Sequence, residues 1–156
     1  MKVLIVYYSR ARHSQKVAEL LKEELNADIE KIQMVDPYPE DEKPHYLLRG
    51  YEAMVGSKPP IKPLGVNPVD YDLVVIGSPT WNWRIAPPVL SFINKHPLKG
   101  KKVALYVSAG GDGVKCIRRF KSKMESAEIV STFVASDPNV AALPEKLAIW
   151  AKELQS

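Results

Sequence analysis

The chain lacks most of the features on which disulfide-rich, metal-binding and membrane proteins depend. Its 156 residues include one cysteine, Cys116, which excludes an intrachain disulfide, and three histidines too scattered to sit at metal-ligand spacing. No apolar run approaches the length of a membrane span, and the N-terminal run is too short for a signal-peptide core. Repeats of fixed period and low-complexity tracts are also absent. We therefore expect one cytoplasmic globular domain, residues 1–156, with no membrane association.

Acidic residues are scarce in one part of the chain. The net charge is only +4, but residues 99–123 hold eight Lys or Arg residues against Asp112 alone. A solvated helix face is one interpretation of this cluster, and a docking surface for an acidic partner is the other. Because Phe120 is the only aromatic residue in the basic run 115–123, a base-stacking groove is not expected, and nucleic acid is not an expected partner.

Short apolar segments alternate with segments of helical periodicity. Strands are predicted at 3–7, 28–34, 73–77, 102–107 and 128–135. Helices are predicted after Ser14, which is a suitable N-cap, after Pro87-Pro88, after Gly113 and at 143–154. The unbroken apolar run 73–77 is typical of a strand buried on both faces of a parallel sheet. This alternation predicts a doubly wound α/β fold, with helices on both faces of a five-stranded parallel sheet.

Residues 36–70 interrupt the alternation with prolines at 37, 39, 44, 59, 60, 63 and 68. A connection of this length is usually functional or disordered. Only 46–54 has the pattern of a short helix, and its large apolar side chains can pack: Tyr46, Leu47, Leu48, Tyr51 and Met54. We expect an ordered flap over one end of the sheet.

Three polar or glycine-rich loops follow three of the strands, at 9–14, 78–84 and 108–113. In a sheet of order 2-1-3-4-5 these strands are neighbours, so the loops converge at the switch point where such sheets bind ligands. The first loop offers hydroxyls, arginines and a helix N-terminus, which suit a phosphate. The second offers indole faces for a flat ring, and the third offers glycine backbone. Together they indicate a mononucleotide site.

Three stretches carry a family resemblance: YYSRARHSQKVAELL, DYDLVVIGSPTWNWRIAPPVLSFI and LKGKKVALYVSAGGDG. They resemble the flavodoxin family of FMN-binding electron carriers and related flavoproteins, in the right order over nearly the whole chain. The resemblance implies a flavodoxin-like fold and FMN as the cofactor. The residues that it assigns to the phosphate are Ser9, Arg10, Ala11, Arg12, His13 and Ser14. Those assigned to the isoalloxazine ring are Pro79, Thr80, Trp81, Asn82 and Trp83, with Ser108, Gly110, Gly111 and Asp112 from the third loop.

Two positions depart from the family pattern [ST]-x-[ST]-G-x-[ST] in the first loop. Ala11 replaces a hydroxyl residue and Arg12 replaces glycine, so either Arg12 supplies charge to the phosphate or the site is weaker. The third loop also lacks the tyrosine that flavodoxins usually have there, and the following helix is basic rather than acidic. We expect one ring face or edge to be less covered, with room for a small planar molecule.

The leading functional hypothesis is an FMN-binding redox protein. It would be a carrier with a redox partner protein, or an oxidoreductase of the NAD(P)H or quinone type that reduces a small planar acceptor, and a homodimer could complete the pocket. The alternative is a binding module that keeps the fold and has lost flavin. A signalling receiver is disfavoured because Gly77-Ser78-Pro79 stands where its phosphoacceptor aspartate is needed. A hydrolase is disfavoured because Cys116 lies within a predicted helix, as a buried apolar residue does.

Overall fold

A parallel sheet of five strands organises the protein. The computed structural model describes residues 1–39, 46–109, 113–136 and 141–156. The parallel strands are β1 (Val3–Tyr7), β2 (Asp28–Lys31), β3 (Leu73–Trp81), β5 (Lys102–Ser108) and β6 (Glu128–Ala135). Their spatial order is β2-β1-β3-β5-β6, and a short strand β4 (Arg84–Ile85) pairs antiparallel with β3. Counting only the parallel strands, this is the predicted order 2-1-3-4-5, so the predicted fold class is confirmed.

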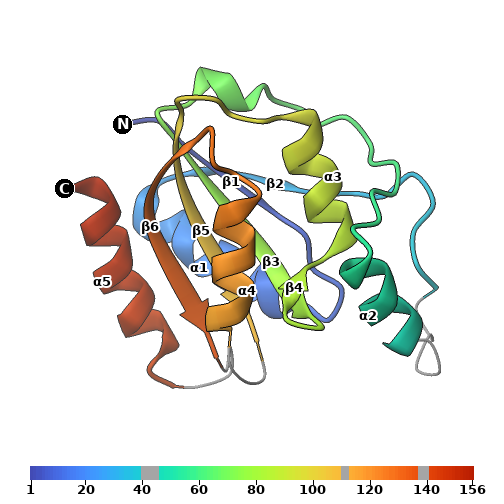
Figure 1. Ribbon diagram of the computed structural model, residues 1–156. Helices are drawn as coiled ribbons and strands as arrows, with labels where there is room; N and C mark the ends of the chain where they lie inside the picture. The colour runs from blue at the N-terminus through green and yellow to red at the C-terminus, as the bar shows by residue number, and fades with distance from the viewer. Residues whose placement is uncertain (40–45, 110–112, 137–140) are drawn as a thin grey trace.

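Helices cover both faces of the sheet (Figure 1). They are α1 (His13–Leu25), α2 (Tyr46–Met54), α3 (Pro87–Lys95), α4 (Val114–Ser122) and α5 (Leu143–Gln155), with a 3-10 turn η2 (Pro68–Asp70). One hydrophobic cluster joins the sheet to α1 and α5, and a second joins it to α3 and α4. This is the two-faced arrangement that the alternation predicts.

The central strand β3 is apolar at every position of its first half because both of its faces are covered. Val74 and Ile76 pack toward α3 and α4, whereas Leu73 and Val75 pack toward α1 and α5. Neighbouring strands follow the same alternation, with Val75 paired to Ile5 on β1 and to Ala104 on β5. Burial on both faces is thus the physical reason for the continuous apolar run.

The segment after Gly77 is a hairpin and not the irregular loop expected from sequence. Strand β3 continues to Trp81 and turns at Asn82 and Trp83, which have φ values of 52° and 58°, before returning as β4. Positive φ at both central residues is the property of the tight turns that join twisted antiparallel strands. The Ser78 hydroxyl closes the base of the hairpin, since Oγ accepts from the Ala86 N–H at 2.9 Å and donates to the Pro79 carbonyl at 2.8 Å.

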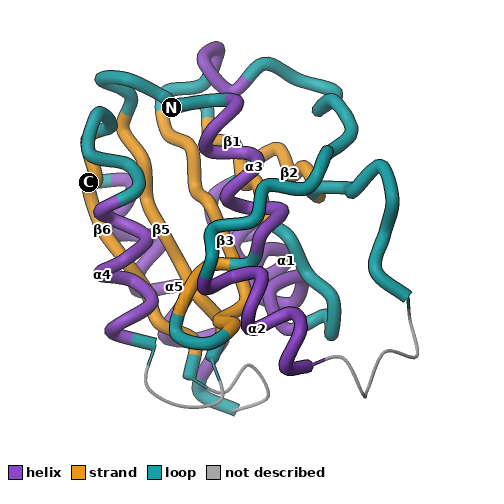
Figure 2. The backbone as a smooth tube through the Cα atoms, turned by 45° about the vertical axis from the view of Figure 1, so that its right-hand side comes forward, coloured by secondary structure: helices purple, strands orange, loops and turns teal. Residues whose placement is uncertain are grey.

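The connection between β2 and β3 also differs from expectation. Strand β2 ends at Lys31, and Met34 makes only an isolated antiparallel bridge with Ile61. The apolar side chains predicted to pack from α2 are largely exposed; Leu47 is 88% exposed and Tyr51 56%. The packed positions of α2 are small residues instead: Ala53 is buried, and a Cβ added at Gly50 would lie 3.5 Å from the Asn82 Cβ. The helix sits beside the end of β3 (Figure 2). Whether residues 36–70 act as a flap stays a prediction.

Within the described part of the chain, none of the helices combines the length and hydropathy that crossing a bilayer would require.

Candidate functional site

The first and third loops are tied together at the carboxyl end of the sheet. Ser14 Oγ and Ser108 Oγ share a buried hydrogen bond of 2.8 Å, and the Tyr106 hydroxyl donates to the Ser14 carbonyl at 2.8 Å. Tyr106 is fully buried and its ring fills the space above Gly77, where an added Cβ would lie 1.9 Å from a ring carbon. Glycine at 77 is therefore what allows this tyrosine to bridge β5 and α1. The predicted convergence of these two loops is confirmed.

Ser9 is the most informative residue of the first loop. Its side chain is buried directly after β1, and its hydroxyl has no hydrogen-bond partner among the described residues. An unsatisfied buried hydroxyl costs about 1–3 kcal/mol, so such groups usually have a partner, often a ligand. Ser9 Oγ is a candidate donor to a molecule bound at this loop.

The turn into α1 depends on Arg12, which precedes the helix as its N-cap with φ 66° and gives it no side-chain cap. The prediction that Ser14 is the N-cap is wrong: Ser14 lies inside the first turn, and its hydroxyl bonds Ser108. Arg12 adopts the left-handed conformation for which glycine is the usual residue, at a cost on the order of 1 kcal/mol. The uncapped first turn leaves backbone N–H groups of α1 available to an anion.

The other residues assigned to the first loop are placed around this turn. Ala11, Arg12 and His13 are exposed. Arg10 donates from Nη2 to the Pro39 carbonyl at 2.8 Å and lies over the Tyr38 ring at 5.9 Å. Arg10 thus joins the first loop to the connection after β2. The assignment of these residues to a phosphate stays a prediction.

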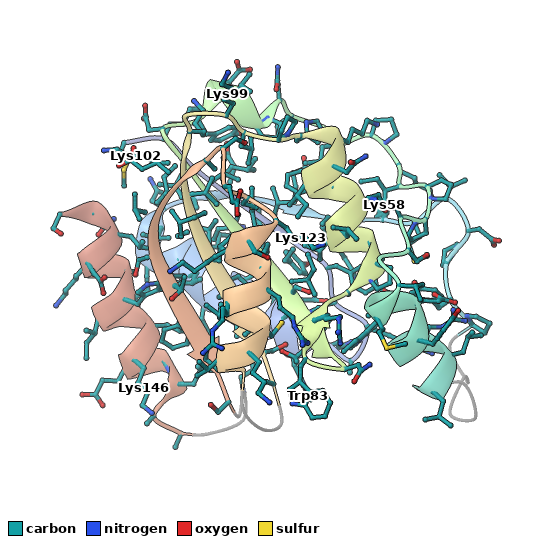
Figure 3. The ribbon with its side chains drawn as sticks, viewed as in Figure 1. Lys58, Trp83, Lys99, Lys102, Lys123 and Lys146 are labelled. Atoms are coloured by element: carbon teal, nitrogen blue, oxygen red, sulfur yellow. The ribbon has the colours of Figure 1, made fainter. Side chains whose placement is uncertain are left out.

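The two tryptophans of the hairpin have different surroundings. Trp81 is half-buried, packing edge-on against Tyr8 at 5.9 Å between ring centroids and against Tyr38 at 5.8 Å. Trp83 is 52% exposed at the tip of the hairpin, as the label in Figure 3 shows. Trp81 therefore packs against the edge of the hydrophobic core, whereas the indole of Trp83 is exposed to solvent.

Two arginines hold the hairpin tip in its strained conformation. Arg84 Nη1 donates to the Asn82 carbonyl at 3.0 Å, and Arg119 Nη1 donates to the Trp83 carbonyl at 3.3 Å. The Lys115 ammonium lies 5.8 Å from the centre of the Trp83 ring. The Asn82 side-chain amide reaches the Gly50 carbonyl at 3.5 Å, which connects the tip to α2. The basic residues of α4 are exposed as a helix face, and part of that face supports the hairpin.

Thr80 of the hairpin neighbours Cys116 of α4. Burial raises the pKa of the Cys116 thiol to about 11, and the neighbouring Thr80 hydroxyl and Arg119 guanidinium oppose that rise only in part. A buried thiol with a raised pKa is a poor nucleophile, which agrees with the prediction of an inert, apolar role for Cys116. Pro79 is half-buried on the same strand.

The third loop is described at its two ends. Ser108 is buried and bonded to Ser14, and Gly113 packs so closely under Val134 that an added Cβ would lie 2.6 Å from it. Gly110, Gly111 and Asp112, also assigned to the ring, lie outside the described residues. Their assignment stays a prediction.

Sequence reasoning missed the aromatic and basic residues that support Trp81 from the connection. The Arg49 guanidinium stacks over the Tyr38 ring at 3.9 Å and forms an ion pair with Glu52, which also accepts from the Tyr38 hydroxyl at 3.3 Å. Burial, together with Glu52, raises the pKa of Tyr38, so its hydroxyl stays protonated. Tyr8 could have been identified from the sequence, because it directly follows β1. No sequence pattern identifies Tyr38 and Arg49, since only the folded connection brings them to the sheet.

The fold and these loops define a class: an open, doubly wound α/β protein whose candidate ligand site lies at the switch point of the sheet. The flavodoxin family matches residues 2–136, so the chain belongs to the flavodoxin family. The resemblance stated from sequence is thereby confirmed. No sequence match was found among curated proteins.

Solved structures agree on the fold. A flavoprotein in complex with FMN from Lactobacillus acidophilus is 21% identical, with a TM-score of 0.75 and coverage of 86% of this chain and 93% of that chain. A structure described as a flavoprotein from Bacteroides eggerthii is 22% identical, with a TM-score of 0.84 and coverage of 99% and 98%. A two-electron reduced flavodoxin from Megasphaera elsdenii is 23% identical, with a TM-score of 0.58 and coverage of 96% and 97%.

Proposed function

We propose that this chain is an FMN-binding redox protein that holds the flavin across the carboxyl ends of β1, β3 and β5. The observation that carries the proposal is the buried hydroxyl of Ser9, which has no partner within the described part of the chain and lies beside the uncapped first turn of α1. Together they supply a hydroxyl donor, backbone N–H donors and a helix dipole at one point, which is what a phosphate dianion needs. Family membership and the FMN complex of the Lactobacillus acidophilus flavoprotein support this choice of cofactor.

The described residues fit the two ends of FMN differently. At the first loop, Ser9 and the helix N-terminus would hold the phosphate, with Arg12 adding exposed positive charge. At the hairpin, Trp83 presents an exposed indole that can stack on a flat ring, and Trp81 supports the hairpin from inside. When bound, the flavin would supply the redox chemistry; the chain would bind it, orient it and control which partners approach it.

FMN and riboflavin distinguish this proposal from a nonspecific flavin site. Titrating the purified protein with each should show FMN bound more tightly, on the order of 100-fold, because only FMN carries the phosphate that Ser9 and the helix N-terminus address. Equal affinities would remove the phosphate assignment. Absence of binding for both would favour the second candidate, a flavodoxin-fold binding module without flavin. That candidate has support in Arg12, which occupies a left-handed position where the family pattern has glycine.

We further propose that the electron acceptor is a small planar molecule such as a quinone. The exposed Trp83 and the absence of aromatic residues from 108–113 would leave part of the ring uncovered. A one-electron carrier acting on a protein partner is the alternative, favoured by the exposed basic residues of α4 beside the hairpin. Stopped-flow oxidation of the reduced protein by a quinone and by a one-electron protein acceptor, at two ionic strengths, separates them. A fast, salt-dependent reaction with the protein acceptor and no reaction with the quinone would favour the one-electron carrier and reject the small acceptor.

A further inference from the structure

A groove of about 310 Å³ opens between the end of α2, strand β4, α3 and α4, and none of the residues assigned individually to the flavin is among its described lining residues. The residues that line it include Met54, Val55, Arg84, Leu90, Arg119 and Lys123. The turn at Gly56 has φ 71°, and a Cβ added at this glycine would lie 3.7 Å from the Leu90 side chain of α3. Figure 3 labels Lys123 on α4, above the hairpin tip that carries Trp83.

The groove is cationic on one side and apolar on the other. Arg119 and Lys123 lie four residues apart, one turn of helix α4, so their side chains share a face, and Arg84 approaches from β4. None of the described residues that line the groove is acidic, and the ion pair described in this structure, Arg49 with Glu52, does not involve these cations. Ile85 and Leu90 are buried in the floor, while Met54 and Val55 are exposed along the rim.

We propose that this groove binds a small organic anion, with a carboxylate or phosphate at Arg84, Arg119 and Lys123 and an apolar body against Met54, Val55 and Leu90. Three cations without a lining carboxylate would leave mutual repulsion that an anion relieves, and guanidinium groups suit the planar, bidentate geometry of carboxylate and phosphate. The volume lies at the lower end of the ligand-pocket range, roughly 300–1,000 Å³, which suits a body of one or two rings. This site is additional to the proposed flavin site.

The same arginines link the groove to the hairpin tip. Arg84 donates to the Asn82 carbonyl, and Arg119 donates to the Trp83 carbonyl. An anion bound in the groove would compete with these carbonyls for the guanidinium N–H groups that hold the strained turn. Occupation of the groove would therefore change the environment of Trp83. An effect on a bound flavin would rest on the proposed function. The change in the environment of Trp83 does not depend on it.

The test uses the full apo chain and two probes, 2-naphthoate and 2-naphthyl phosphate, with neutral 2-naphthamide as the uncharged control. Calorimetry should show binding of an anionic probe and much weaker binding of the amide. The tighter of 2-naphthoate and 2-naphthyl phosphate identifies the preferred head group. Arg119→Gln and Lys123→Gln should each weaken binding about tenfold. Arg118→Gln and Lys121→Gln are matched controls on the same helix, since neither residue lines the groove, and they should leave the affinity unchanged.

A second readout locates the probe. The indole N–H resonance of Trp83, assigned with Trp83→Phe, should shift on titration with 2-naphthoate in wild type and not in Arg119→Gln. Saturating FMN, where it binds, should not displace the probe competitively, although coupling through Trp83 would change its affinity. Equal loss of affinity in the Arg118 or Lys121 variants, equal binding of the amide, or competitive displacement of the probe by FMN would each overturn the groove as an anion site. Failure of FMN to bind would count against the proposed function alone.

Discussion

The first loop and the β3–β4 hairpin lie at the same end of the sheet but are stabilised in opposite ways. The first loop is anchored from inside by buried polar contacts: Ser14 bonds Ser108, and Tyr106 bonds the Ser14 carbonyl. The hairpin tip projects into solvent with two consecutive positive-φ residues, and guanidinium donors from Arg84 and Arg119 hold it. Both regions contain strained backbone, at Arg12 in one and at Asn82 and Trp83 in the other.

Under the proposed function, the two regions would serve two kinds of recognition. A phosphate is recognised by donors fixed in place, and hydrogen bonds to β5 fix the end of the first loop. A flat ring needs an exposed aromatic face, which a projecting hairpin provides. Strain at positions that glycine would occupy without cost indicates that local side chains matter there for more than stability.

Gly77→Ala should give the largest effect, by breaking the internal anchor of the first loop. The new methyl group would overlap the Tyr106 ring, which is fully buried, so we expect a loss of about 3 kcal/mol or more in the free energy of unfolding. Urea denaturation measures it. Gly50→Ala is the matched control, because its Cβ meets Asn82 at an ordinary 3.5 Å, and it should not destabilise the protein. A Gly77→Ala protein as stable as wild type would show that Tyr106 can move without cost.

Trp83→Ala tests the exposed side of the comparison. If Trp83 stacks on the flavin ring, its removal should weaken FMN binding by roughly 1–3 kcal/mol, by analogy with base–aromatic stacking, with little change in stability. Trp81→Ala should instead lower stability, since Trp81 packs against Tyr8 and Tyr38. Fluorescence titration with FMN and thermal denaturation measure the two effects. If Trp81→Ala is stable but no longer binds FMN, and Trp83→Ala is unaffected, then Trp81 and not Trp83 stacks on the flavin.

Ser9→Ala should have effects of opposite sign on binding and stability. Removing an unsatisfied buried hydroxyl should raise the unfolding free energy of the apo protein by about 1 kcal/mol, while the lost donor should weaken FMN about tenfold. Ser126→Ala, far from the loops, is the control for loss of a serine hydroxyl. Riboflavin affinity should not change, because riboflavin has no phosphate. Loss of apo stability in Ser9→Ala would mean that the hydroxyl already has a protein partner.

Arg12→Gly should give the smallest effect, a gain of stability of up to about 1 kcal/mol from relief of the left-handed conformation. If the exposed guanidinium also attracts the phosphate, FMN binding to this variant should lose part of its salt dependence. Titrations at low and high salt, in wild type and Arg12→Gly, measure that difference. Tighter FMN binding with unchanged salt dependence would make Arg12 a strained residue with no part in phosphate binding.

Much of the fold was predictable because its signals are local. Strands 3–7 and 128–135 and helix 46–54 were predicted at the bounds that the structure shows, since apolar runs and helical spacing reflect burial at each position. The hairpin was missed because its turn contains Asn-Trp and not the Asn-Gly that marks such turns, so the sequence carried no glycine signal for positive φ. The N-cap at Ser14 was wrong because the partner of its hydroxyl, Ser108, is distant in sequence.

The sequence alone determined the α/β alternation and the family, because the first depends on periodicity and the second on short contiguous motifs. The strand order came with the fold that the family resemblance implies. Only the tertiary structure decided which tryptophan is packed and which is exposed, and that Tyr38 and Arg49 support the hairpin. It also decided that Ser9 is buried with no partner among the residues that the structure describes. It also decided that the cations of α4 and β4 meet in one groove. These features depend on contacts between residues tens of positions apart, and only packing of the folded chain brings such residues together.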